Sequence, residues 1–484
     1  MTPTKSAVLF ALPLALAACQ TGRVADPEMP PQKPFNVILM MADDLASNDL
    51  SCYGGRHIQT PRIDRMAAEG LRLTDYYAGS AVCSPSRMAL LAGAYPARLG
   101  WRRGVLGYGF EPGTGMSPAV YTVAEAFRDA GYRTAMAGKW HLGAGAMQPE
   151  RQGFESSLYI RMSNNQNRDM YRDGELVAAD WDNRLLTETF AEEAIRVIES
   201  EREKPFFLYL PWSAPHFPAE PHPDWAGRSG GDRTAPYRDV VAELDARVGD
   251  VMDALERSGR ADSTIVVFTS DNGRQSGQET APPDPLYSGR KWQSLEGGTR
   301  VPCIVWCPGV VQPGRSDMLM AAIDLFPSLA GACGVRVAPP AGAQRLDGLD
   351  LWSLLASAGA SSGPARAELL YWHGQGAATA IRSGSWKLRF HSSEEKPLDP
   401  PLAEGPELFD LRADPREEVD RAAEYPAIVQ RLAERARALL EDVYGAQVPL
   451  GCEPGAEAPS APVQAADVWG PWLEAAALPR AGEI

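Results

Sequence analysis

The sequence predicts an α/β fold: a central, mostly parallel sheet flanked by helices, followed by a smaller C-terminal α+β part. Three nearly continuous apolar runs are typical of parallel strands that are buried on both faces. These runs are Asn36–Met41, Pro205–Pro211 and Ser263–Phe268. Amphipathic segments with helical periodicity separate them, and this alternation is typical of layered α/β domains. A chain of 484 residues, 44% of them hydrophobic, can bury a large core.

The charge of the chain limits its partners. The formal net charge is −15, whereas a protein that binds nucleic acid presents a basic face, so we expect no nucleic-acid partner. The acidic field also repels anions, so any anion-binding site has to be built locally. Only seven of the 47 basic residues are lysines. Because arginine dominates, each lysine is a candidate for a specific role.

The N-terminus has the features of an export signal. Lys5 precedes an apolar run, residues 7–18, that is too short to span a membrane and is typical of a signal peptide over residues 1–18. The run ends in a sequence that resembles a bacterial lipobox, in which Cys19 is lipidated. We therefore expect an exported bacterial protein, periplasmic or anchored in the outer membrane through Cys19, with residues 19–34 as a proline-rich tether. An ordinary cleaved signal peptide is the alternative.

An acidic pair follows the first buried strand. Asp43 and Asp44 stand at its carboxyl end, where open α/β sheets bind ligands. Two adjacent acids there are costly unless a positive group neutralises them. A divalent cation is the natural partner because carboxylate oxygens suit calcium or magnesium. The alternative is an acidic loop or a helix N-cap. A scaffold helix is then expected over Thr60–Gly70, with Pro61 at its first position.

The next helix is predicted to begin near Cys83-Ser84-Pro85-Ser86-Arg87 and to end at Gly93. Cys83 then lies at a helix N-terminus, where backbone N–H groups and the helix dipole favour an anion. Arg87, one turn later, can direct its guanidinium to the same place. A cysteine in such a position is expected to be a reactive thiol. The alternative is a structural or disulfide-bonded cysteine.

Lys139 and His141 follow a short predicted strand, Arg133–Ala137, and a helix over Tyr121–Ala130 precedes it. Alternation along the extended chain would point both side chains the same way. A fixed cation beside an imidazole is suited to holding an anion and carrying a proton. The alternative is two ordinary surface residues near glycines.

His216 and Lys291 are two further candidates. His216 stands between two prolines in the loop after Pro205–Pro211, which places it rigidly; the alternative is a packed loop histidine. Lys291 lies near Gly297 and Gly298, where a backbone without side chains can approach a ligand closely; the alternative is a solvated surface charge. The helices in this part of the chain are expected over Leu186–Glu199 and Tyr237–Arg257.

The third buried strand leads into Thr269-Ser270-Asp271-Asn272-Gly273. Asp271 and Asn272 again place oxygen ligands at a strand end. Together with the acidic pair after the first strand they form an oxygen cage for one cation. The alternative is a turn, which Asp-Asn-Gly commonly forms. Repetition of the pattern at several strand ends favours the metal site.

The composition changes after residue 356, where a stretch of small residues, Ser357–Pro364, indicates a linker. Beyond it we expect an antiparallel meander with one helix, Ala427–Tyr444, packed on it. The meander strands are Leu369–Trp372, Ala378–Ile381 and Trp386–Phe390. The predicted parts of the chain are a main catalytic domain at 35–356, a C-terminal α+β subdomain at 365–450, and an extended or disordered tail at 451–484.

Six motifs in order resemble the type I, formylglycine-dependent sulfatases of the arylsulfatase-A-like kind, in the alkaline phosphatase superfamily. The resemblance covers about Asn36 to Glu418, and its motifs are MADDL, CSPSR, GKWHLG, PFFLYLPWSAPHFP, TSDNG and EGGTRVP. It implies a doubly wound, alkaline-phosphatase-like sheet and one bound Ca2+, with Mg2+ as the alternative ion. The metal ligands that it implies are Asp43, Asp44, Asp271 and Asn272. Ala46 and Ser47 depart from the glycine and aromatic residue often found after the Asp-Asp pair, which affects the expected loop shape but no ligand.

The resemblance also implies that a formylglycine-generating maturation enzyme oxidises Cys83 to formylglycine, and that Arg87 fixes its hydrate. One hydroxyl of the hydrate would attack the sulfur, and His216 or Lys291 would protonate the leaving alcohol. The second hydroxyl, deprotonated by His141, would then expel sulfate. The residues implied around the sulfate are Lys139, His141, His216, Lys291 and, judged only by its distance from Gly153-Phe154, Ser163.

The predicted function is therefore a sulfuric ester hydrolase that cleaves an aryl or sugar sulfate. One alternative is a phosphomonoesterase or phosphonate ester hydrolase on the same fold, although six histidines without a metal-type pair argue against a two-zinc phosphatase. Another is a glycan-binding surface lipoprotein in which Cys83 is never oxidised. The segments Gly104–Gly115 and Arg161–Arg172 are polar or contain glycine, so a sugar sulfate is as compatible as an aryl sulfate.

Overall fold

The computed structural model describes residues 1, 34–101, 104–108, 113–200, 203–275, 286–359, 365–374, 376–391, 402 and 405–452. The chain divides into two units, Met1–Lys33 and Pro34–Ile484, and every element below belongs to the second. The predicted signal peptide, Cys19 and the tether up to residue 33 lie outside the described residues, as do residues 453–484 of the predicted tail. No helix among the described residues is long and apolar enough to cross a bilayer.

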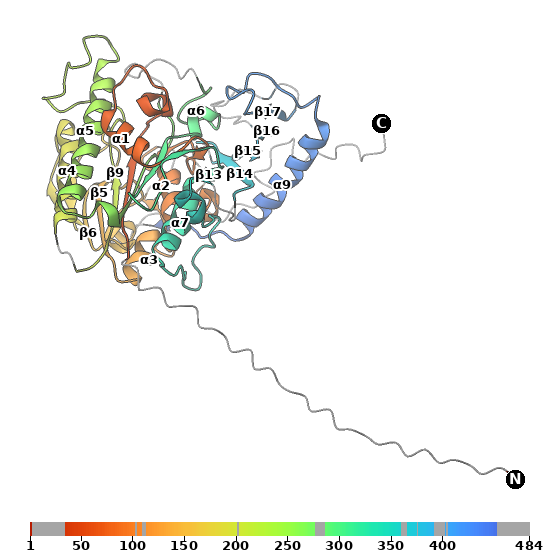
Figure 1. The fold of residues 1–484 in the computed structure, drawn as a ribbon, viewed down its shortest axis with the longest axis horizontal. Coiled ribbons are helices and arrows are strands. Elements are labelled where there is room, and N and C mark those ends of the chain that lie inside the picture. The colour runs from red at the N-terminus through yellow and green to blue at the C-terminus, as the bar shows by residue number, and fades with distance from the viewer. Residues whose placement is uncertain are drawn as a thin grey trace. The chain divides into compact units, whose positions relative to one another are not determined.

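A ten-stranded mixed sheet forms the centre of this unit (Figure 1). Its five middle strands are parallel neighbours. Three of them are the predicted apolar runs, a fourth is the short strand expected at Arg133–Ala137, and the fifth, Ser156–Ile160, was not predicted. In spatial order they are β10 (Thr264–Ser270), β1 (Asn36–Ala42), β9 (Phe206–Pro211), β5 (Arg133–Lys139) and β6 (Ser156–Ile160). Short strands extend both edges and bring in antiparallel pairs. They are β11 (Cys303–Trp306), β2 (Leu71–Leu73) and β12 (Gly314–Ser316) beyond β10, and β7 (Met170–Arg172) and β8 (Glu175–Ala178) beyond β6.

The sheet is doubly wound because both of its faces are covered by helices. Successive side chains of a strand point to opposite faces, and β1 feeds two separate cores. Val37, Leu39 and Met41 belong to one hydrophobic cluster, and Ile38 and Met40 belong to the other. The first cluster includes residues of α2 (Cys83–Ala92), α3 (Val123–Asp129), α7 (Leu325–Ala332) and α8 (Trp352–Ala356). The second includes residues of α1 (Pro61–Glu69), α4 (Leu186–Glu199) and α5 (Ala235–Arg257).

A separate four-stranded antiparallel sheet follows near the C-terminus. Its strands are β14 (Glu368–Trp372), β15 (Ala378–Ser383), β16 (Trp386–Arg389) and β17 (Glu407–Asp410), and α9 (Pro426–Gly445) packs on them. This small sheet and α9 lie away from α4 and α5 (Figure 1). Val82, Cys83 and Ala89 share a hydrophobic cluster with the small sheet, so the sheet supports the beginning of α2. The meander is confirmed; β17, with an acid at each end, was not predicted.

Several element ends differ from the predicted ones. The helix expected over Tyr121–Ala130 begins at Val123, because the Thr122 hydroxyl caps it by accepting a hydrogen bond from the Glu125 backbone N–H at 3.1 Å. The strands β5 and β10 each run two residues further than expected, through Lys139 and Ser270, since their polar ends pair with neighbours inside the sheet.

The remaining short elements join loops to one another. They are α6 (Glu296–Thr299), the pair β3 (Tyr76–Tyr77) and β13 (Met320–Ala321), and the pair β4 (Thr114–Gly115) and β18 (Gly451–Cys452). The first two residues of the predicted tail are therefore a strand. The proposed limits of the catalytic domain and the C-terminal subdomain stay predictions, because the whole segment from Pro34 onward clusters as one unit. Five of the described cysteines, Cys52, Cys83, Cys303, Cys307 and Cys333, form no disulfide.

Candidate active site

The carboxyl ends of four parallel strands, β1, β5, β9 and β10, deliver seven of the predicted site residues to one place, and α2 and the loop before α6 add Cys83, Arg87 and Lys291. Residues Ala42 of β1 and Ser270 of β10 are paired neighbours, so the loops that follow them emerge side by side. The Asp44 backbone N–H donates to Asp271 Oδ1 at 3.2 Å. The active-site cluster, as we call it, contains Asp43, Asp44, Cys83, Arg87, Lys139, His141, His216, Asp271, Asn272 and Lys291, and all ten are buried.

A glycine allows two of the motifs to meet. Gly273 donates its backbone N–H to the Gly298 carbonyl oxygen at 2.9 Å. A Cβ at Gly273 would lie 1.9 Å from the carbonyl oxygen of Gly297, which is far inside a contact distance. The loop that carries Asp271 and the segment after Lys291 can therefore lie against each other because Gly273 has no side chain.

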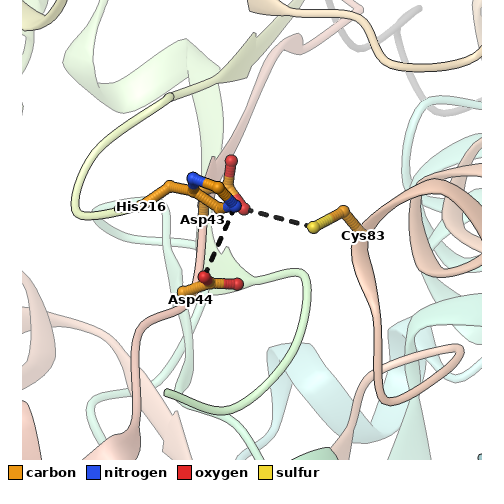
Figure 2. Close-up of side chains that lie close together, drawn as sticks. All are labelled: Asp43, Asp44, Cys83 and His216. Carbon is orange, nitrogen blue, oxygen red and sulfur yellow. Dashed lines mark hydrogen bonds and ion pairs between the residues drawn. The ribbon is translucent and has the colours of Figure 1, made fainter. Parts of the chain in front are cut away.

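Cys83 is the first residue of α2, as predicted. Its Sγ lies 3.6 Å from Asp43 Oδ1, and Figure 2 shows Cys83 and His216 reaching toward the Asp43–Asp44 pair from different parts of the chain. Burial raises the pKa of the Cys83 thiol to about 12, against the opposing effect of Lys139 and Lys291. Burial thus acts against the helix terminus and the cations at this thiol, and its reactivity stays a prediction.

Arg87 holds the acids of the cluster rather than the thiol. Its Nε and Nη2 donate to Asp271 Oδ2 at 3.0 and 2.8 Å, and its Nη1 donates to the Lys139 carbonyl oxygen at 2.9 Å. Its Nη2 also lies 3.5 Å from Asp43 Oδ2. This guanidinium ties the loops after β1, β5 and β10 together, because it bonds to a residue from each.

Two lysines face the acidic pair. Lys139 Nζ lies 2.5 Å from Asp43 Oδ2, and Lys291 Nζ lies 2.7 Å from Asp44 Oδ1. Although burial alone would raise it, Lys139 and the neighbouring cations hold the pKa of Asp43 well below its ordinary value. Burial and the charge of Asp43 raise the pKa of Asp271. An ammonium has three N–H donors, and each lysine contacts a single carboxylate, so both retain donors for an anionic ligand.

The two histidines are held as neutral rings. His216 Nδ1 lies 2.7 Å from the Phe217 carbonyl oxygen and 3.0 Å from Asn164 Oδ1; two acceptors at this nitrogen favour a proton there. Its Nε2 then faces Asp44 Oδ2, 3.7 Å away. Burial, followed by the charge of Lys291, lowers the pKa of His216 to about 4.

His141 is held through the opposite nitrogen. Its Nε2 lies 3.0 Å from the Leu106 carbonyl oxygen, and its buried Nδ1 has no hydrogen-bond partner among the described residues. Burial and Lys139 hold its pKa well below the ordinary value. Its backbone has a φ of +57°, so the simple strand alternation expected from Lys139 to His141 does not hold: β5 has ended, and the left-handed turn places the ring.

The four expected metal ligands present oxygen atoms in one buried place. Asp43, Asp44 and Asp271 are carboxylates, and the buried Asn272 Oδ1 has no hydrogen-bond partner in the described part of the chain. Ligand atoms of Asp43 and Asp44, with those of Cys83 and His216, lie within 4.8 Å of one another. An unpartnered buried acceptor beside three carboxylates fits a hard, oxygen-preferring divalent cation.

Sequence reasoning missed Asn164, the side chain that contacts His216. Its neighbour Ser163 was predicted instead; Ser163 is also buried, and its backbone N–H lies 3.3 Å from Gln166 Oε1. A substrate contact by Ser163 stays a prediction. Residues 163–167 read Ser-Asn-Asn-Gln-Asn, so no local signal distinguishes the one amide that meets a histidine.

Comparisons with known proteins are consistent with this geometry. The family model described as Sulfatase matches residues 35–335. An N-acetylgalactosamine-6-O-sulfatase of Bacteroides thetaiotaomicron is 30% identical, with 88% of this chain and 96% of its own covered. Arylsulfatase A of Homo sapiens is 34% identical, with 80% and 83% covered. A solved structure described under the metabolism of multiple glycosaminoglycans by Bacteroides thetaiotaomicron is 28% identical to this chain and has a TM-score of 0.74. The match covers 84% of this chain and 99% of the chain in that structure.

Proposed function

The chain belongs to the sulfatase family, and from this premise we propose that it hydrolyses a sulfate monoester of a sugar or aryl alcohol, using a formylglycine made from Cys83 and one bound Ca2+. The reaction consumes water and releases the alcohol and sulfate. The observation that carries the proposal is the position of Cys83: the thiol stands 3.6 Å from Asp43, at the start of α2, among buried carboxylates and cations.

The burial of the Cys83 thiol is better explained if Cys83 is the precursor of formylglycine than if the thiol is itself the nucleophile. A buried thiol with a raised pKa stays protonated at neutral pH and is a poor nucleophile. Oxidation by a formylglycine-generating enzyme replaces it with an aldehyde, with loss of the elements of hydrogen sulfide and gain of an oxygen. The hydrated aldehyde supplies a hydroxyl nucleophile that does not depend on thiol ionisation.

The oxygen ligands would hold the metal ion at the same place. Asp43, Asp44, Asp271 and Asn272 are the residues that we assign to calcium, with magnesium as the alternative ion. When bound, the ion supplies positive charge that polarises a sulfate oxygen. It also offsets the charge of the three carboxylates, whose burial and mutual repulsion raise the pKa of Asp271.

The chain's own cations neutralise the ester. Lys139 and Lys291 direct their remaining N–H donors to the sulfate oxygens, and Arg87 keeps the carboxylates in place through Asp271. Such preorganised charges in a buried site stabilise charge that develops as the S–O bond breaks. The net charge of −15 on the chain makes this local arrangement necessary.

The two histidines divide the proton transfers. His216 faces the site with Nε2, and the negative charge of an arriving ester raises its pKa from about 4, which enables it to donate a proton to the leaving alcohol; Lys291 is the alternative donor. His141, neutral with an unpartnered Nδ1 among the described residues, accepts the proton that is released when sulfate leaves. Asn164 acts as a positioning residue, because it contacts His216 Nδ1.

The proposed cellular location is supported only by the predicted N-terminal signal peptide. We propose that the protein is exported by a bacterium and held at the membrane through a lipid on Cys19, as a periplasmic or outer-membrane lipoprotein. Metabolic labelling with a fatty acid tests this: Cys19→Ala should lose the label, whereas Cys52→Ala should keep it.

The function is tested with protein produced together with a formylglycine-generating enzyme. We expect mass spectrometry of the Cys83 peptide to show the aldehyde, and sulfate release from 4-nitrophenyl sulfate or a sugar sulfate to disappear with a calcium chelator and to return with added Ca2+. Faster turnover of an aryl phosphonate than of the aryl sulfate would favour the phosphonate hydrolase. Converted Cys83 with no sulfate release from any ester of a broad panel would overturn the proposal.

A further inference from the structure

A polar pocket lies next to the active-site cluster. It encloses about 490 Å³, a volume within the range of about 300–1,000 Å³ that is usual for small-molecule sites. The segment after β6, the residues before α4 and the loop after His216 line it. The lining residues used below are Asn164, Arg168, Asp169, Asp180, Asn183, Phe217 and Glu220.

The pocket is connected to both histidines. Asn164 lines the pocket and also contacts His216 Nδ1. Gln166, another lining residue, donates its Nε2 to the Leu106 carbonyl oxygen at 3.1 Å, and the same carbonyl holds His141. A ligand in the pocket therefore lies on the side of His216, the group that we assign to the leaving alcohol.

The pocket offers hydrogen bonds without a full set of protein partners. Asn183 is only 7% exposed, and its Nδ2 donates to Glu220 Oε2 at 2.7 Å. Its Oδ1 is buried and has no hydrogen-bond partner among the described residues. A buried acceptor without a donor costs free energy, and a ligand hydroxyl or amide N–H is suited to satisfy it.

Phe217 adds an apolar surface to these polar groups. Its side chain is 48% exposed although it is large and aromatic, and it follows His216 directly in the chain. An aromatic ring beside amides and carboxylates suits a ligand that has both C–H faces and hydroxyl groups. A flat apolar aryl or steroid group would leave the polar groups of the pocket without partners.

The charge of the pocket is negative. Three carboxylates line it, Asp169, Asp180 and Glu220, against one guanidinium, that of Arg168, so the balance is −2. Arg168 forms an ion pair with Asp180, which reduces its attraction for an anion. A second sulfate or a uronate carboxylate bound here would meet like charge.

We propose that this pocket binds the alcohol part of the ester and selects an uncharged sugar ring that bears hydroxyl or amide groups, in preference to uronate-containing or multiply sulfated sugars and to apolar aryl groups. This inference rests on the proposed function, since it places the scissile sulfate in the active-site cluster and the sugar beside His216.

Binding and turnover are measured on three esters: a neutral monosaccharide monosulfate, a monosulfated disaccharide that contains a uronate, and 4-nitrophenyl sulfate. Binding is measured by calorimetry on the Cys83→Ala variant, so that it does not depend on maturation or turnover. We expect the neutral sugar sulfate to bind tightest. Phe217→Ala should weaken its binding about tenfold and should weaken binding of 4-nitrophenyl sulfate less.

Two further variants complete the test. Val419→Ala removes another exposed apolar side chain, 47% exposed and outside the pocket, and should leave the order of affinities unchanged. Asp180→Asn removes one carboxylate and releases Arg168, so it should raise the affinity for the uronate disaccharide several-fold relative to the neutral sugar. Thermal unfolding of each variant confirms that it is folded.

Equal loss of affinity for all three esters in Phe217→Ala, or tighter binding of the uronate disaccharide by the unaltered pocket, would overturn the inference. Failure of the proposed function is distinguishable, because it would remove sulfate release by the matured protein without changing the order of affinities in Cys83→Ala.

Discussion

Two buried charge clusters with the same balance behave differently in this protein. The active-site cluster contains three acids and three permanent cations. So does a second charge cluster, between α6 and the small sheet, which consists of Asp75, Glu296, Arg300, Arg382, Lys387 and Glu417. In the second cluster Lys387 Nζ donates hydrogen bonds to Ser294 O at 2.9 Å and Glu296 Oε1 at 3.1 Å, and it forms an ion pair with Glu417 Oε1 at 2.8 Å. In the active site, Lys139 Nζ meets one oxygen of Asp43, and Lys291 Nζ meets the two oxygens of Asp44 at 2.7 and 2.8 Å.

The contacts available to the buried polar atoms, rather than charge balance, therefore distinguish the two clusters: even Glu417 Oε1, which has no hydrogen-bond partner among the described residues, is paired with the charge of Lys387. Glu296 also accepts from the hydroxyls of Tyr77 and Tyr371 at 2.6 and 3.1 Å. Although burial alone would raise it, Lys387 and the two arginines hold the pKa of Glu296 below its ordinary value. In the active site, Asn272 Oδ1 and His141 Nδ1 have no partner within the described chain, which leaves capacity for an ion and an ester.

The largest expected effect is the loss of the nucleophile. Cys83→Ala should reduce sulfate release by at least about 10⁴-fold, as removal of an enzyme nucleophile commonly does, while the free energy of unfolding changes little. Sulfate is quantified by ion chromatography and unfolding by denaturant titration. Cys303→Ala, a change at another buried cysteine, is the matched control for activity. Retained turnover in Cys83→Ala would end the nucleophile assignment.

The next effect separates the two clusters directly. Lys387→Met should lower the free energy of unfolding by about 3–5 kcal/mol, because it leaves the buried Glu417 carboxylate without its cation and removes one of the cations of Glu296. Lys139→Met should lower kcat/KM by about 10²–10³-fold with a smaller loss of stability, because Arg87 remains 3.5 Å from Asp43. Denaturant unfolding and steady-state kinetics are measured on both variants. The reverse pattern would contradict the distinction between the clusters.

A third buried carboxylate sharpens the comparison, because it lacks a cation network. Glu243 accepts one backbone N–H, from His222 at 2.8 Å. Burial raises its pKa from 4.5 to about 7, against smaller opposing effects of the His222 backbone and Arg247. A carboxyl with a raised folded-state pKa stabilises the fold below about pH 4.5, and this contribution is lost as the pH rises through about 7.

Replacement of this carboxyl should remove that loss. Between pH 4.5 and pH 8, the free energy of unfolding of Glu243→Gln should rise relative to the parent by roughly 3 kcal/mol. Urea titrations of both proteins at several pH values measure the difference. A matched change at an exposed acid, Glu424→Gln, should show no such trend. A constant difference across the pH range would mean that Glu243 is ionised throughout.

The smallest expected effect concerns a neutral positioning group. Asn164→Ala should lower kcat about tenfold and shift the acidic limb of the pH–rate profile, because it removes one of the two acceptors at His216 Nδ1 and leaves only the Phe217 carbonyl oxygen. Ser163→Ala is the matched neighbour: a loss in kcat/KM without a change in the profile would support its predicted sulfate contact. A profile unchanged in Asn164→Ala would show that Asn164 has only a structural role.

Local patterns in the sequence were sufficient for the central strands and for most of the site. The apolar runs that became β1, β9 and β10 are buried along their whole length, and such runs are rarely anything else in an α/β chain. Because parallel strands share one carboxyl edge, the sequence predicted that Asp43 and Asp271 lie close together although 228 positions separate them. The motif at Cys83 likewise contains the residues that predict where α2 begins.

Other features depend on partners that no local pattern reveals. The edge strand β17 forms because Leu388 of β16 offers it a register with Leu408. The left-handed backbone of His141 reflects hydrogen bonds between its own backbone N–H and Arg161 and between its ring and Leu106. The thiol of Cys83 was expected to be reactive from its helix position, but burial by distant elements decided its pKa.

The sequence by itself determined the order of the main strands and helices along the chain, the edge at which charged groups gather, and the family to which the chain belongs. Only the tertiary structure decided which lysines keep spare donors, which amide orients His216, and how a negatively charged pocket comes to lie beside it. The physical reason is the distance along the chain over which each effect acts. Hydrophobic periodicity and turn-forming residues act over a few positions, whereas burial, hydrogen-bond partners and pKa values are set by groups that meet only after folding.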